Sequence, residues 1–305
     1  MLISGKKILA AAHKSEYAIG HFNFINMEVL QAIAEAAEEE RSPVFISTTE
    51  GAIKYAGTRY LYALAQAAAK EHPKVPIALH LDHGKDMAII KSCIDSGWTS
   101  VMFDGSSLPF EENIAKTKEV VKLCRWNGIN VEAELGVLSG VEDDVSSEVS
   151  KYTDPSQAET FVKQTGCHSL AVAIGTSHGA YKFKGKSALD ITRLQEIRKR
   201  VNIPLVLHGA SGVYPDIVAL AKKYGAKLTG ASGVSDDMIR QAVAAGIRKI
   251  NCDTDLRLSF ITGVRQTLQE KPGDVDLRPF LGNGRTLVKE MVQRKIRVFG
   301  SNNKF

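Results

Sequence analysis

The sequence predicts an α/β fold, a (β/α)8 TIM barrel with extra terminal helices, from three observations. Eight short β-like runs each precede an amphipathic helical stretch, which is typical of a parallel sheet built from βα units. The 305 residues, 44% hydrophobic and 24% charged, are enough to form one barrel domain over residues 1–305. Polar residues follow most of the β-like runs, as in barrels that carry their chemistry at the strand ends. An open doubly wound sheet is the alternative fold.

The predicted strands are short β-like runs: Ala18–Phe22, Val44–Ser47, Ile77–Leu81, Ser100–Phe103, Asn130–Ala133, Ser169–Ile174, Leu205–Leu207 and Arg248–Ile250. The predicted helices repeat apolar residues with a helical period: Met27–Glu40, Leu61–Lys70, Met87–Asp95, Glu111–Asn127, Ala158–Thr165, Ile191–Arg200, Ile217–Tyr224 and Leu256–Glu270. Three more helical segments decorate the barrel: Gly5–Lys14, Asp236–Ala245 and Arg285–Phe299. The stretch Gly136–Pro155 is too long for an ordinary connection, and we expect a functional lid there.

The charge balance limits the class of partner. A net charge of +5 without a basic tract favours a small anionic ligand over nucleic acid. No apolar run is long enough for a secretory signal or a membrane span, so we expect a cytoplasmic protein with no membrane partner. Cys93, Cys124, Cys167 and Cys252 show no CxxC spacing, which indicates free thiols rather than disulfides or a thiolate zinc site.

Three histidines, His83, His178 and His208, each follow a β-like run and are each followed by glycine. Neutral imidazole is the commonest protein ligand for zinc, and three such ligands with an open fourth position describe a catalytic site. A structural role is the usual alternative for one buried histidine, but three such settings favour a zinc triad at the barrel mouth. The other histidines lack this setting, and we expect structural roles for His21, His80 and His168 and exposed positions for His13 and His72.

Polar residues end most of the predicted strands, and they comprise Asn23, Ser47, Asp82, Asp104, Glu134, Asn251 and Asp253. Asp82 directly precedes a proposed ligand. A nearby zinc favours its carboxylate while burial favours its acid, a balance that suits a group exchanging a proton during turnover. The alternative role for Asp82 is to orient His83. Asp104, Glu132 and Glu134 are candidates to orient the metal ligands.

Three segments could hold a phosphate through backbone N–H groups and helix N-termini: Gly175–Lys182, Gly209–Gly212 and Asn251–Thr254. Barrels often bind phosphate in the loops after their last two strands, and Lys182 offers an added cation. A glycine-rich turn alone is weak evidence, because turns use glycine in any case.

Six ordered motifs resemble the class II (zinc-dependent) fructose-bisphosphate aldolases, in particular the class IIB branch that includes tagatose-bisphosphate aldolases. The motifs are spread over the whole chain. They are Gly20-His-Phe-Asn, His80-Leu-Asp-His-Gly, Val131-Glu-Ala-Glu-Leu-Gly, Ala173-Ile-Gly-Thr-Ser-His-Gly, Leu207-His-Gly-Ala-Ser-Gly and Asn251-Cys-Asp-Thr-Asp-Leu-Arg. The resemblance implies reversible cleavage of fructose 1,6-bisphosphate to dihydroxyacetone phosphate and glyceraldehyde 3-phosphate, as in glycolysis and gluconeogenesis. Zinc would polarise the ketose carbonyl, and no lysine would form an imine.

The resemblance also implies roles for single residues. His83, His178 and His208 would bind zinc, and Asp82 would move the proton at the C4 oxygen. Glu142 would move the proton at C3, although Asp143, Asp144 and Glu148 are neighbours that could replace it. The phosphate of the dihydroxyacetone phosphate half would contact Gly179, Lys182, Gly209, Ser211, Asp253 and Thr254, with Na⁺ or K⁺ as an additional cation.

Further substrate contacts implied by the resemblance are Asn23, Ser47 and Asn251, with Arg257 for the distal phosphate of a neighbouring subunit, which calls for a homodimer or homotetramer. His21, Cys252 and Tyr214 depart from the usual pattern. Two rival functions remain open. One is cleavage of tagatose 1,6-bisphosphate, which differs only in configuration at C4. The other is a non-catalytic phosphosugar-binding barrel, which would need neither Asp82 nor Glu142 as a proton carrier.

Overall fold

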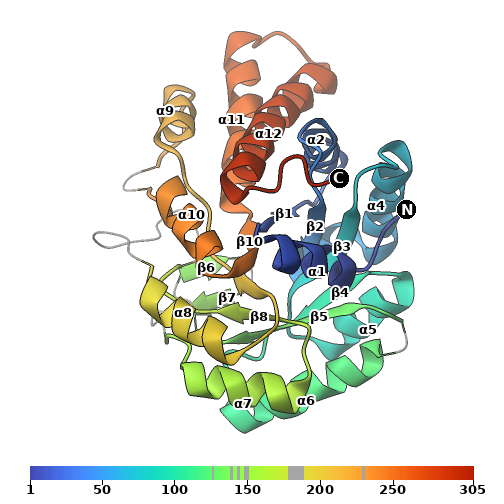
Figure 1. Ribbon diagram of the computed structural model, residues 1–305. Coiled ribbons are helices and arrows are strands. Elements are labelled where there is room, and N and C mark those ends of the chain that lie inside the picture. The colour runs from blue at the N-terminus through green and yellow to red at the C-terminus, as the bar shows by residue number, and fades with distance from the viewer. Residues whose placement is uncertain (126, 138–139, 143–144, 148–150, 178–188, 229–230) are drawn as a thin grey trace.

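A closed barrel of eight parallel strands forms the centre of the molecule (Figure 1). The computed structural model describes residues 1–125, 127–137, 140–142, 145–147, 151–177, 189–228 and 231–305. Around the barrel the strands follow the order β1-β10-β9-β8-β5-β4-β3-β2. Each strand therefore pairs with the barrel strand before it in the sequence, and β1 pairs with β10 to close the ring. The predicted TIM barrel is confirmed.

The barrel strands lie at the predicted places, and their bounds are β1 Ile19–Asn23, β2 Val44–Thr49, β3 Ile77–Gly84, β4 Ser100–Phe103, β5 Asn130–Leu135, β8 Ser169–Val172, β9 Leu205–Leu207 and β10 Ile247–Cys252. Between β5 and the next helix, β6 (Gly140–Glu142) and β7 (Val145–Ser147) pair as an antiparallel hairpin. The long connection predicted as a lid thus carries strand structure of its own.

The helices of the first half of the chain are α1 Gly5–Ser15, α2 Met27–Glu39, α3 Glu50–Ala56, α4 Thr58–Glu71, α5 Met87–Ser96 and α6 Phe110–Cys124. Those of the second half are α7 Pro155–Thr165, α8 Ile191–Arg200, α9 Pro215–Lys223, α10 Asp236–Ala244, α11 Thr254–Glu270 and α12 Leu277–Phe299. Two details differ from the sequence prediction. Helix α3 was not predicted; Thr49 caps it by accepting a hydrogen bond from the backbone N–H of Ala52. Helix α12 begins two turns before the predicted start at Arg285.

Apolar packing divides into two layers. The larger cluster lies between the outer faces of the strands and the surrounding helices and includes Ile46, Leu79 and Val101. The smaller cluster joins Ile8 and Leu9 of α1 to Ile19, Phe45 and Ala78 of the strands. Helix α1 therefore closes the amino-terminal end of the barrel, which leaves the carboxyl ends of the strands as the end where a site can open.

Polar side chains fill the middle of the barrel instead of the usual branched apolar residues. Lys249 is wholly buried there, and its Nζ lies 3.0 Å from Oε1 of Glu132. His80 Nδ1 and Ser100 Oγ are 2.6 Å apart, and the Asn130 amide donates to Ser100 Oγ over 3.2 Å. Because buried polar groups are costly without partners, this interior is a connected hydrogen-bonded layer beneath the strand ends.

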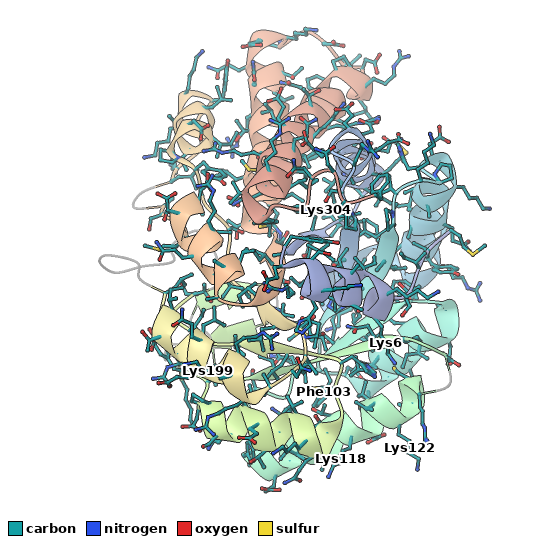
Figure 2. All side chains as sticks on the ribbon, viewed as in Figure 1. Lys6, Phe103, Lys118, Lys122, Lys199 and Lys304 are labelled. Atoms are coloured by element: carbon teal, nitrogen blue, oxygen red, sulfur yellow. The ribbon has the colours of Figure 1, made fainter. Side chains whose placement is uncertain are left out.

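Charged side chains cover the outer helix faces, as Lys118, Lys122 and Lys199 show in Figure 2, whereas Phe103 is buried. Helices α11 and α12 lie side by side and extend away from the barrel (Figure 1). None of the described helices has the length and apolar character needed to cross a membrane.

Candidate active site

Two histidines from different strands point ring nitrogens at each other at the carboxyl end of the barrel. His83 lies in β3 and His208 directly follows β9. Nε2 of His83 and Nδ1 of His208 are 2.9 Å apart, and both side chains are buried. His83 has a φ of 48°, an uncommon backbone conformation for a residue other than glycine, which turns the chain at the strand end. Sites that hold such strained residues are frequently functional.

A carboxylate fixes the tautomer of each of these imidazoles. Nδ1–H of His83 donates to Asp104 Oδ2 over 2.9 Å, and Glu134 Oε2 lies 3.6 Å from the same nitrogen. Nε2–H of His208 donates to Glu132 Oε1 over 2.9 Å. The remaining nitrogen of each ring is then the one that faces the other ring. This carboxylate–histidine arrangement is the usual support of metal-binding histidines.

The spacing of the two facing nitrogens is close to the one that a shared metal ion requires. Nitrogens that each lie about 2.0–2.1 Å from a tetrahedral zinc are about 3.3 Å apart, so an opening of a few tenths of an ångström would suffice. Asp82, His83 and His208 place one ligand atom each within 4.8 Å of one another. Two lone pairs that face each other repel unless a cation or a proton lies between them, so the donor geometry favours a cation.

The electrostatics of the site agree with this assignment. Burial disfavours the charged form of His83, but Asp82, Asp104 and Glu134 outweigh it and raise the pKa of His83 to about 10. Burial and the charge of His83 lower the pKa of His208 to about 4, although Glu132 opposes the shift. The charges around His83 therefore favour a cation at the facing nitrogens, and a metal ion bound there would take the place of a proton.

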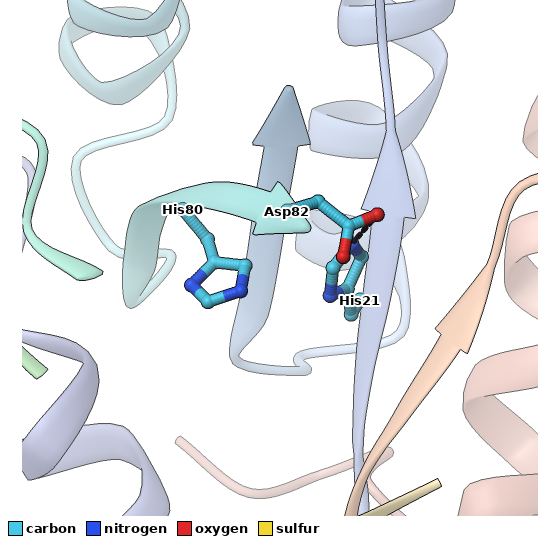
Figure 3. Close-up of side chains that lie close together, drawn as sticks. All are labelled: His21, His80 and Asp82. Carbon is cyan, nitrogen blue, oxygen red and sulfur yellow. Dashed lines mark ion pairs between the residues drawn. The ribbon is translucent and has the colours of Figure 1, made fainter. Parts of the chain in front are cut away.

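Three side chains surround the carboxylate of Asp82. Asn23 Nδ2 donates to Oδ2 over 2.9 Å, and Asn251 Nδ2 donates to Oδ1 over 3.2 Å. His21 Nε2 lies 3.4 Å from Oδ2, and Figure 3 shows the His21 ring directly beside this carboxylate, with His80 further away on the strand that carries Asp82. Burial would raise the pKa of Asp82, but the neighbouring His21 and His83 hold it well below its usual range. Asp82 is thus an ionised carboxylate close to His83 and His208.

His21 and Lys249 also contact this site, although the sequence predicts a structural role for His21 and gives no prominent signal for Lys249. His21 Nε2 lies 2.8 Å from Asn23 Oδ1, and since a carbonyl oxygen only accepts, His21 is protonated at Nε2. Lys249 Nζ donates to Asn251 Oδ1 over 3.1 Å. The two residues therefore orient the two amides that hold Asp82. Their period-2 spacing from Asn23 and Asn251 was the only sequence signal for them.

The described candidate phosphate contacts follow the last two strands of the barrel, Gly209 and Ser211 after β9 and Asp253 and Thr254 after β10. Gly209 has a φ of 60°, and a Cβ there would lie 2.6 Å from the backbone oxygen of Ser177, so only glycine fits. Ser211 is buried, and Thr254 begins α11, whose N-terminal N–H groups favour an anion. Arg257 Nη2 lies 2.6 Å from Asp253 Oδ2, one turn into the same helix.

One predicted substrate contact is buried, and several predicted residues lie outside the described residues. Ser47 is wholly buried and pairs in register with Asn23, and its Oγ has no hydrogen-bond partner among the described residues. His178, Gly179, Lys182, Asp143, Asp144 and Glu148 lie outside the described residues. The backbone of Glu142 ends strand β6.

Comparisons with known proteins decide the family. The model of the family "Fructose-bisphosphate aldolase class-II" matches residues 3–304. Fructose-bisphosphate aldolase of Helicobacter pylori is 44% identical over 306 residues and covers 100% of both chains. The chain belongs to the class-II fructose-bisphosphate aldolases. The aldolase of Thermus caldophilus is 46% identical over 306 residues, with 99% of both chains covered.

The barrel geometry of this class-II aldolase also matches a solved relative. The YdjI aldolase of Escherichia coli K12 superposes with a TM-score of 0.80 at 36% identity, covering 100% of this chain and 99% of the other. The family is metal-dependent, in agreement with the group formed by Asp82, His83 and His208. The predicted family and enzyme class, a metal-dependent aldolase acting on a phosphosugar, are therefore confirmed.

Proposed function

We propose that residues 1–305 form one catalytic domain that cleaves fructose 1,6-bisphosphate reversibly to dihydroxyacetone phosphate and glyceraldehyde 3-phosphate. The observation that carries this proposal is the pair of facing nitrogens of His83 and His208, 2.9 Å apart and each supported by a carboxylate, with the ionised Asp82 beside them. A binding protein would need no base at this position.

His83, His208 and His178 would hold a zinc ion, because three imidazoles with an open fourth position match its preferred catalytic coordination. When bound, zinc supplies Lewis-acid polarisation of the ketose carbonyl. Asp104, Glu132 and Glu134 orient the imidazoles from behind. A monovalent cation, Na⁺ or K⁺, would assist near the phosphate.

Asp82 accepts the proton of the C4 hydroxyl during cleavage. The electron pair of the O–H bond forms the aldehyde carbonyl as the C3–C4 bond breaks. The electron pair of the C3–C4 bond remains on the dihydroxyacetone phosphate half. Glu142 then supplies a proton at C3. Asn23 and Asn251 hold the Asp82 carboxylate over 2.9 and 3.2 Å, which keeps it aimed at the substrate oxygen. In synthesis the same groups act in reverse.

The phosphate of the dihydroxyacetone phosphate half binds to Gly209, Ser211, Asp253 and Thr254, together with Gly179 and Lys182. The start of α11 at Thr254 supports this placement, because helix N-termini favour anions. Asn23, Ser47 and Asn251 are the proposed contacts to the rest of the sugar. Lys182 serves as a charge for the phosphate and forms no imine.

A homodimer or homotetramer completes the site in this proposal, with Arg257 reaching the distal phosphate of a neighbouring subunit. Arg257 is 52% exposed, and it lines a cavity of about 640 Å³ beside Asn23 and Asp253. The exposed apolar side chains of Ile25, Tyr55 and Ile261 line the same cavity, as expected at a subunit contact. The buried free cysteines fit the reducing cytoplasm.

The test is triose phosphate release from fructose 1,6-bisphosphate by the purified protein, before chelation, after chelation and after zinc is restored. The proposal expects cleavage that is lost to the chelator and regained with zinc. Tagatose 1,6-bisphosphate in a parallel assay identifies the preferred C4 configuration. Absence of cleavage of both sugars by the zinc-loaded protein would reject the proposal in favour of a binding barrel.

A further inference from the structure

Two buried charges lie outside the proposed chemistry. Lys295 of α12 and Asp255 of α11 have side chains 1% and 0% exposed, and Lys295 Nζ is 2.8 Å from Asp255 Oδ2. Burial would lower the pKa of Lys295, but Asp255 outweighs this effect and raises it above its ordinary value. Apolar residues of similar volume are often as stabilising as such a pair, so stability alone gives little reason for it.

Both oxygens of Asp255 hold the loop that follows β9. The backbone N–H of Gly212 donates to Oδ2 over 2.7 Å, and that of Val213 donates to Oδ1 over 2.7 Å. Val213 has a φ of 44°, which is strained for a β-branched residue and persists only when the surroundings enforce it. Hydrogen bonds to an ionised carboxylate are about twice as strong as neutral ones, so Asp255 can enforce this conformation.

The loop held in this way carries two proposed phosphate contacts, Gly209 and Ser211. On its other side, the backbone N–H of Val234 donates to the carbonyl oxygen of Ser211 over 3.0 Å. Lys295 Nζ also lies 4.4 Å from the centre of the Tyr214 ring, at the end of the same loop. The loop is therefore held from both sides, and Lys295 pairs with the same Asp255 carboxylate whose two oxygens accept from Gly212 and Val213.

We propose that Lys295 and Asp255 are positioning residues, which hold the Gly209–Tyr214 loop in the conformation that binds the substrate phosphate. The inference rests on the phosphate site of the proposed function but not on the reaction catalysed there. Neither residue touches the substrate in this scheme. The last helix, α12, thereby supports the phosphate site from outside the barrel.

The test measures binding of inorganic phosphate to the zinc-loaded protein by calorimetry, together with kcat and KM for fructose 1,6-bisphosphate. Lys295→Met should raise the Kd for phosphate and the KM about tenfold, and leave kcat within about twofold. The matched control is Ser301→Ala, which removes a buried 2.8 Å hydrogen bond to Ser42 at the end of α12, away from the loop. The control should leave the Kd for phosphate unchanged.

A double variant, Lys295→Met with Asp255→Asn, separates positioning from stability. This double variant leaves no unpaired charge buried. It should therefore regain most of the stability lost in Lys295→Met, as measured by urea unfolding. Phosphate affinity should stay low, because one amide oxygen cannot accept as both carboxylate oxygens do. Recovery of phosphate affinity along with stability, or a native Kd in either variant, would overturn the inference. If the native protein binds phosphate but does not cleave the sugar, and the variants lose phosphate binding, the proposed reaction is rejected and the positioning role is retained.

Discussion

Replacing Asp104 tests the metal centre at the residue that orients His83. Hydrogen bonds to charged groups contribute about 1.5–3 kcal/mol, and the bond from His83 Nδ1–H to Asp104 is buried and 2.9 Å long. Asp104→Asn keeps a neutral acceptor of about half the strength, which leaves a loss of about 1–1.5 kcal/mol or about a tenfold rise in the Kd for zinc. Asp104→Ala removes the bond, and the rise approaches 100-fold.

The assay is competition between the apo protein and a chromogenic zinc chelator at fixed pH. Asp86→Asn is the matched control, because Asp86 is an exposed carboxylate of the same region that caps α5 by accepting from the N–H of Ala88 over 2.7 Å. It should leave the Kd within about twofold of native. Native zinc affinity in both Asp104 variants, or an equal loss in the Asp86 control, would refute the assignment of Asp104 as the group that orients the ligand.

Three further predictions follow from the same contacts. Asp82→Ala should lower cleavage by about 10²–10⁴-fold while bound zinc, measured by atomic emission, stays at the native level; native turnover would exclude Asp82 as the proton carrier. His21→Phe removes the N–H that holds Asn23 over 2.8 Å, so kcat should fall about tenfold, whereas His21→Gln keeps a donor and most of the activity; equal losses would argue against positioning. Burial lowers the pKa of His168 to about 4, and its Nδ1 accepts from the Val131 N–H over 2.8 Å. The stability contributed by neutral His168 is therefore present above pH 6.5 and lost as the pH falls toward 4. This pKa shift corresponds to about 3 kcal/mol, which partial exposure reduces to about 1–2 kcal/mol. In urea unfolding, His168→Gln should therefore lose less stability between pH 7 and pH 4 than the native protein does. The same pH dependence in both proteins would contradict the assignment.

The sequence predicted the barrel because short β-like runs alternate with stretches of helical period along the whole chain, which is typical of repeated βα units. It predicted the start of the closing helix at Arg285, whereas the helix begins at Leu277. Pro279 and Gly284 make this stretch resemble a loop, but proline is tolerated in a first helical turn. A Cβ at Gly284 would lie 2.8 Å from the Phe260 ring of α11, so this glycine allows close helix packing. Only the tertiary contact reveals that.

Part of the site could be predicted from residue type and part could not. His83, His208 and Asp82 stand at strand ends beside glycine-rich sequence, so their type and position indicate chemistry. Lys249 lies within a strand, and its partner Glu132 is on another strand of the barrel. Which strands face each other across the barrel depends on closure geometry, which no local pattern encodes. The pair of Lys295 and Asp255 could not be predicted for a similar reason, because the two residues come together only when α11 and α12 pack against each other.

Closure of the barrel through β1 and β10 has a consequence for protein synthesis. Ile19 pairs with Lys249, 230 residues further along the chain, so the ribosome must make most of the protein before the ring can close. Until then β1 and the most recently made strand present unpaired edges, which invite pairing with other nascent chains. Contacts of such long sequence separation also form slowly. The growing chain is therefore most exposed to aggregation just before β10 emerges, and chaperones that shield strand edges would act in that interval.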